Sequence, residues 1–114
     1  MRILSVQFQP RLSPGLSVAK VIALTAERIA GDSAVSAFEV SKGNDRGPYV
    51  NFQLTVQNRK LVHLWRLVRS RLLNHPSLGP RLRRGTIVTC QGSRGWDNYL
   101  LLHHFDPKVP LDIL

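Results

Sequence analysis

The sequence has 114 residues, a length at which one hydrophobic core forms without disulfides or a metal ion. Hydrophobic residues make up 43% of it, which argues against a disordered chain, and no apolar run approaches the roughly 18 residues that cross a bilayer. The chain opens on a strand-like segment rather than a signal peptide. We therefore expect a single cytoplasmic domain over residues 1–114 with no membrane contact.

The net charge of +9 is concentrated in the middle of the chain. From Arg46 to Trp96 there are ten basic side chains, nine of them arginine, and no Asp or Glu, whereas basic and acidic residues are nearly balanced elsewhere. Arginine binds phosphate and carboxylate groups through paired hydrogen bonds, so this asymmetry indicates an anionic partner. An arginine-rich composition inherited from a GC-rich genome is the alternative explanation.

In the first part of the chain, residues 2–9 alternate between apolar and polar side chains until Pro10, which predicts a strand. Residues 18–30 carry apolar side chains at helical spacing, which predicts a helix that ends at Gly31. Residues 34–41 are expected to form a second strand, followed by a turn over residues 43–48.

The next strand and helix have the clearest patterns. Residues 49–57 predict a third strand whose core-facing side chains are Val50, Phe52, Leu54 and Val56. Asn58 is expected to cap a second helix that stops before Pro76. The buried stripe of that helix is expected to contain Leu61, Leu64, Trp65, Val68 and Leu72.

Residues 86–91 and 96–105 predict a fourth and a fifth strand joined by a turn, and residues 106–114 predict an irregular tail. The order is therefore strand, helix, strand, strand, helix, strand, strand. It predicts an α+β fold, a ferredoxin-like split β-α-β antiparallel sheet with both helices on one face. The fifth strand would extend one edge of the sheet as a hairpin.

In such a sheet the first and third strands are neighbours at the centre, so their outward side chains form one patch on the helix-free face. This patch is uncharged, and its contact residues are expected to be Gln7, Tyr49, Asn51, Gln53 and Thr55. A face that meets only water normally includes Lys and Glu, so neutral polar side chains around a tyrosine favour a contact surface. A second copy of the chain would cover it in a homodimer; a plain solvated sheet is the alternative.

Helix geometry places the basic residues of the second helix on its outer face and flanks. More arginines follow along the chain, the last of them at a hairpin tip, with no acid to neutralise them. The predicted contacts with a phosphate backbone are Arg59, Lys60, Arg66, Arg69, Arg81, Arg83, Arg84 and Arg94. A basic helix face that meets only solvent is the alternative interpretation.

The start of the third strand, Arg46-Gly47-Pro48-Tyr49-Val50-Asn51-Phe52, is similar to the signature strand of RNA-recognition-motif domains. In that comparison Tyr49 matches the outward stacking aromatic residue. One residue is missing before Tyr49, Pro48 replaces the first aromatic, and the first strand has Leu4 where the family has another ring. The resemblance is confined to this segment and implies a similar fold without membership of the family.

The sequence predicts no catalytic residue, metal ligand or cofactor. His103 and His104 are adjacent on a predicted strand, so we expect them on opposite faces, and His63 and His75 are expected at the surface. Cys90 is expected to be a buried apolar residue, and no phosphate loop or nucleophile elbow is present. An enzyme with a cavity between sheet and helices is kept as an alternative, although the sequence favours a protein without catalysis.

Arg94 and Trp96 at the last hairpin suggest a charge and stacking pair, with Trp96 and Tyr99 packed on opposite faces as the alternative.

Together the charge, the sheet face and the basic helix predict a small basic binding module for an anionic partner, namely nucleic acid (RNA or DNA backbone) or another polyanion. A homo-oligomeric assembly module that uses the uncharged sheet face is the first alternative, and a small enzyme of unassigned chemistry is the second.

Overall fold

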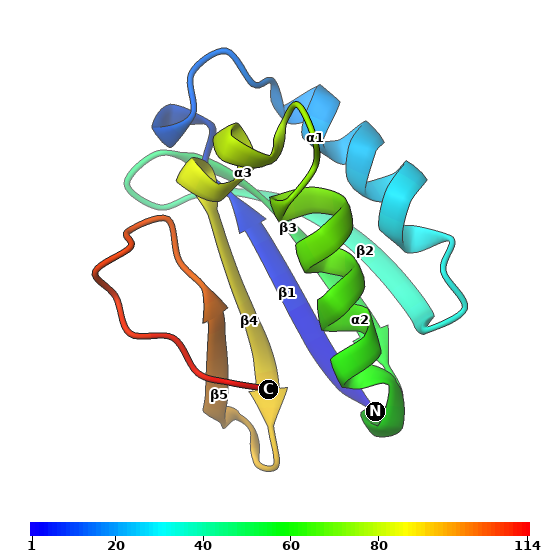
Figure 1. Ribbon diagram of the computed structural model, residues 1–114. Helices are drawn as coiled ribbons and strands as arrows, with labels where there is room; N and C mark the ends of the chain where they lie inside the picture. The colour runs from blue at the N-terminus through cyan, green and yellow to red at the C-terminus, as the bar shows by residue number, and fades with distance from the viewer.

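The computed structural model describes residues 1–114 and has a five-stranded antiparallel sheet with helices on one face (Figure 1). The strands are β1 (Arg2–Phe8), β2 (Val35–Asn44), β3 (Pro48–Val56), β4 (Thr86–Gly92) and β5 (Gly95–His103). The helices are α1 (Val18–Thr25), α2 (Leu61–Val68) and α3 (Gly79–Gly85). The predicted α+β class is confirmed.

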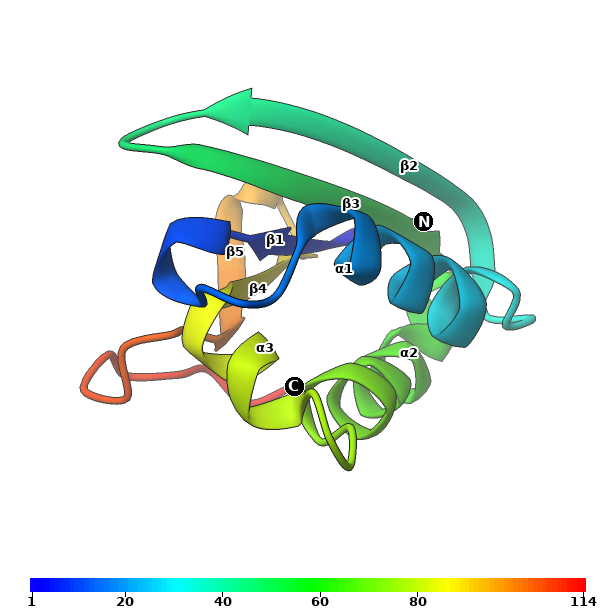
Figure 2. The same ribbon diagram turned by 90° about the horizontal axis from the view of Figure 1, so that it is seen from above.

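The sheet has the strand order β2-β3-β1-β4-β5. The predicted pairing of the first strand with the third is confirmed, and β1 pairs with β4 on its other side. The predicted hairpin of the fourth and fifth strands is also confirmed, so β5 forms one edge and β2 the other. Seen from above, all three helices lie on the same side of the sheet, and the other face is open (Figure 2).

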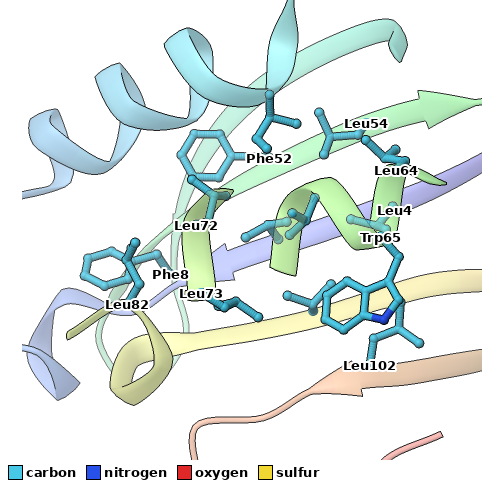
Figure 3. Packing of buried hydrophobic residues seen from close by; sticks show 14 of the residues in the cluster. Leu4, Phe8, Phe52, Leu54, Leu64, Trp65, Leu72, Leu73, Leu82 and Leu102 are labelled. Carbon is cyan, nitrogen blue, oxygen red and sulfur yellow. The ribbon is translucent and has the colours of Figure 1, made fainter. Parts of the chain in front are cut away.

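The core lies between the sheet and the helices, and it follows the predicted patterns. Val50, Phe52, Leu54 and Val56 of β3 are all fully buried, opposite Leu4, Val6 and Phe8 of β1. The predicted stripe of α2 is buried as well, and Figure 3 shows Leu64 and Trp65 pointing from this helix onto the sheet. One continuous cluster of 22 buried apolar residues results.

The predicted element order is wrong at one place, because α3 stands between the second helix and the fourth strand. Only Leu82 of this short helix is a buried apolar side chain, so no periodic pattern marks it in the sequence. The proline near its start, Pro80, has a fixed φ that suits the first helical turn and was the one available signal.

The start and end of the second helix also differ from the prediction. The chain enters it through a 3-10 turn, η3 (Asn58–Lys60), which makes Gln57 the capping residue, and no side-chain cap is formed; the prediction of Asn58 as cap was wrong. A π-helical turn, η4 (Arg69–Leu73), continues α2, and a similar turn, η2 (Ala26–Ala30), continues α1. Another 3-10 turn, η1 (Pro10–Leu12), follows β1.

The tail, residues 106–114, is irregular, as predicted, but it is fixed to the sheet. The backbone N–H of Asp112 donates to the Leu101 carbonyl, and the Leu101 N–H donates to the Asp112 carboxylate, both at 2.8 Å. Leu114 packs against the core. The tail therefore continues the helical layer across β4 and β5 (Figure 1).

None of the helices has the length and apolar character needed to span a membrane.

Candidate anion-binding surface

Almost all basic side chains of the chain lack an acidic partner. His63 and Arg71 each lie 3.7 Å from Asp32, and Arg28 lies 3.7 Å from Glu27. No other Lys or Arg nitrogen lies within 4.0 Å of a carboxylate. None of the eight residues predicted to contact a phosphate backbone therefore has an ion-pair partner.

Two of these residues, Arg66 and Arg69, line a first pocket of about 350 Å³ between α2, β5 and the tail. Its apolar floor includes Trp65 and Leu102, and Figure 3 shows the indole of Trp65 lying over Leu102. The Arg69 guanidinium lies 5.7 Å from the centre of the Trp65 ring and covers part of it. Asp112 also lines this pocket, so an acid stands near the two arginines.

A second pocket, of about 370 Å³, lies between α3 and the end of β5. Arginine, histidine, proline and phenylalanine form it, and none of its lining residues is acidic. They are Pro80, Arg83, Arg84, His103, His104, Phe105 and Pro107. The second pocket therefore combines positive charge with aromatic and proline rings.

The polar groups of the second pocket are almost all hydrogen-bond donors. Burial lowers the pKa of His103, so the ring is neutral at pH 7, and its Nε2–H donates to the Arg83 carbonyl at 3.1 Å. His104 Nδ1 accepts the N–H of Asp106 at 3.0 Å, which leaves the ring proton on Nε2. Arg83 donates through Nη1 to the Leu73 carbonyl, while the Arg84 side chain has no protein acceptor.

The prediction that His103 and His104 point to opposite faces was wrong, because both line this second pocket. β5 ends at His103, so the alternation of a strand no longer applies at His104. Sequence reasoning also missed Phe105 as a site residue. Its place beside Arg83 and Arg84 depends on α3, which no sequence pattern revealed.

The remaining predicted phosphate contacts are spread over the molecule. Arg59 and Lys60 lie in η3 before α2, where Arg59 Nε donates to Gln57 at 3.1 Å, and Arg81 is exposed on α3. Arg94 lies in the turn between β4 and β5, at the opposite end of β4 from α3 (Figure 1). The structure therefore does not bring Arg94 together with the arginines of α3. Nor does Arg94 form a cation–π pair with Trp96, because the one such pair is that of Arg69 with Trp65.

The predicted sheet-face residues do lie together. Gln7 is opposite Asn51 in the β1–β3 pair, and Ser5, whose hydroxyl donates to Asn51 at 2.7 Å, is opposite Gln53. Thr55 is opposite Ile3 on the same face. Tyr49 differs from a free stacking residue, because its ring crosses Gly43 of β2 and fills the space that a side chain would need there.

Cys90 is fully buried, as predicted, and burial raises the pKa of its thiol, so it is held as the unreactive thiol form.

Comparisons of the chain with protein-family models, curated proteins and solved structures find no match.

Proposed function

We propose that this chain is a small basic module that binds the phosphate backbone of nucleic acid through the side of the molecule formed by α2, α3 and the end of β5. The observation that supports it best is the set of arginines there without acidic partners, Arg66, Arg69, Arg81 and Arg84. A folded protein gains from pairing such charges, and a polyanion supplies the missing counter-charge while releasing its condensed counterions.

The arrangement of the two pockets adds to this support. Leu102 lines the first pocket and its neighbour His103 lines the second, so arginines of α2 and α3 flank one short stretch of β5. Each pocket holds two arginines beside an aromatic side chain. This combination of cationic and aromatic groups along a continuous surface is typical of proteins that follow a nucleic-acid strand.

The proposal is tested by two double variants that remove the same charge from different faces. Arg66→Ser with Arg84→Ser removes two arginines of the proposed surface, and Lys20→Ser with Arg28→Ser removes two basic residues of α1 and η2. Fluorescence anisotropy with a labelled oligonucleotide at low salt is expected to show weaker binding for the first variant, and near wild-type binding for the second. Equal losses in both variants would mean that net charge alone attracts the nucleic acid and would contradict a defined surface.

The open sheet face favours assembly with a second copy as the other candidate function. Ile87 and Thr89 of β4 lie opposite Gln7 and Ser5, so the uncharged face extends over a third strand. Glu39 of β2, opposite Gln53, also lies on this face, but β1, β3 and β4 present no charged side chain there. In a chain with net charge +9, two copies could meet over these three strands without bringing arginines together. A monomer in analytical ultracentrifugation at high protein concentration would remove this candidate.

We also propose that the fold is a variant of the ferredoxin-like sheet with an added helix and edge strand. The adjacent first and third strands and the shared helical face support this relation. A cytoplasmic location is part of the same proposal.

A further inference from the structure

We propose that the second pocket, between α3 and the end of β5, holds one unpaired nucleotide of a single strand, with its base against Phe105 and its phosphate on Arg84. This inference rests on the proposed function and adds to it the form of nucleic acid that is bound. It also assigns base contact to a place where the sequence predicted only backbone contact.

The charge of the second pocket suits a phosphate group. Arg84 is exposed and without a protein acceptor, and the Nε2–H of His104 is free because Nδ1 already accepts the Asp106 N–H. Arg83 donates one hydrogen bond through Nη1 to the Leu73 carbonyl and keeps its positive charge. Because no acid lines the pocket, these donors have no internal counter-charge, and a phosphate fits them.

The rings of the second pocket suit a nucleic-acid base. The rings of His104 and Phe105 lie with their centres 4.2 Å apart and are tilted by 33°, so they form a small aromatic pair. Pro80 and Pro107 complete apolar walls beside it, and the volume of about 370 Å³ is within the range of ligand pockets. A planar base can stack on the Phe105 ring of this pair, and only an unpaired base can leave its own helix to do so.

The first pocket is a poorer place for a base. Its aromatic residue, Trp65, is 9% exposed and is covered by Arg69. Asp112 lines this pocket too, so the positive charge of Arg66 and Arg69 is partly offset there, whereas no acid lines the second pocket. The first pocket is therefore assigned to the general cationic surface, and base contact is assigned to the second.

The test compares two probes that have the same backbone charge: a fluorescent oligothymidine and a strand of the same length made of abasic sugar-phosphates. We expect the native chain to bind oligothymidine at least about five-fold more tightly, the loss of one stacked base being worth that factor or more. Phe105→Ala is expected to remove this difference while leaving the affinity for the abasic strand unchanged. Tyr99→Ala, which removes an exposed aromatic ring of β5 outside both pockets, is expected to keep the difference.

Circular dichroism and melting temperature establish that Phe105→Ala folds. His104→Ala is a second variant of the same aromatic pair. Equal binding of both probes by the native chain would overturn the inference while leaving the proposed backbone binding intact. A difference that survives in both ring variants would also overturn it. Binding of neither probe would reject the proposed function and the inference with it. Thymidine monophosphate that binds as tightly as the strand would overturn the assignment to a strand.

Discussion

The arginines of this chain differ in what their guanidinium groups contact, and the contact decides what each residue does. Arg71 pairs with Asp32 and donates to the Arg28 carbonyl at 3.0 Å, which joins η4 to η2. Arg83 donates to the Leu73 carbonyl at the end of η4. Arg81 and Arg84, on the same short helix, have no protein partner, so their charge is available to an external anion.

Arg83→Ser and Arg81→Ser are therefore expected to differ in stability although each removes one charge from α3. Loss of Arg83 leaves the terminal carbonyl of η4 without its donor and should lower the free energy of unfolding by about 1 to 2 kcal/mol. Arg81→Ser should stay within about 0.5 kcal/mol of the native chain, as an exposed substitution without partners does. Urea denaturation measures both, and equal stability of the two variants would contradict the structural role of Arg83.

At the scale of elements, the strength of the pattern decides what the sequence can predict. β3 and α2 have regular apolar positions because each packs one face on the core, and their buried residues were predicted correctly. α3 has a single buried apolar side chain among arginines, so its pattern was too short to recognise. The β5 boundary was also missed, since the residues after His103 remain partly apolar although the strand has ended.

Trp65 joins α2 to the β5 side of the sheet, and its replacement tests this packing. Trp65→Ala is expected to lower the free energy of unfolding by about 3 to 5 kcal/mol, because a large side chain that is 9% exposed would leave a cavity over Leu102. Val62→Ala on the same helix is the control, since Val62 is 41% exposed and should cost about 1 kcal/mol or less. A melting temperature that Trp65→Ala leaves unchanged would contradict this packing.

On the scale of the whole molecule, the two faces of the sheet have different characters. The open face presents uncharged side chains from β1, β3 and β4, with Glu39 beside them on β2. The opposite side of the molecule presents the arginines of α2 and α3. The charge asymmetry of the sequence predicted that a cationic surface exists. It did not predict the pockets, because they form where α3, the end of β5 and the tail meet, and each of these positions depends on long-range packing.

The central claim is that the arginines of this surface replace counterions on a phosphate backbone. The dependence of binding on salt concentration tests this claim most directly. In an anisotropy titration across a salt series, the logarithm of the affinity of the native chain should fall linearly with the logarithm of the salt concentration. Arg66→Ser with Arg84→Ser should flatten that slope by about 1.4 to 1.8, the sum for two lost phosphate contacts. No binding at low salt, or a slope that the double variant leaves unchanged, would contradict the account.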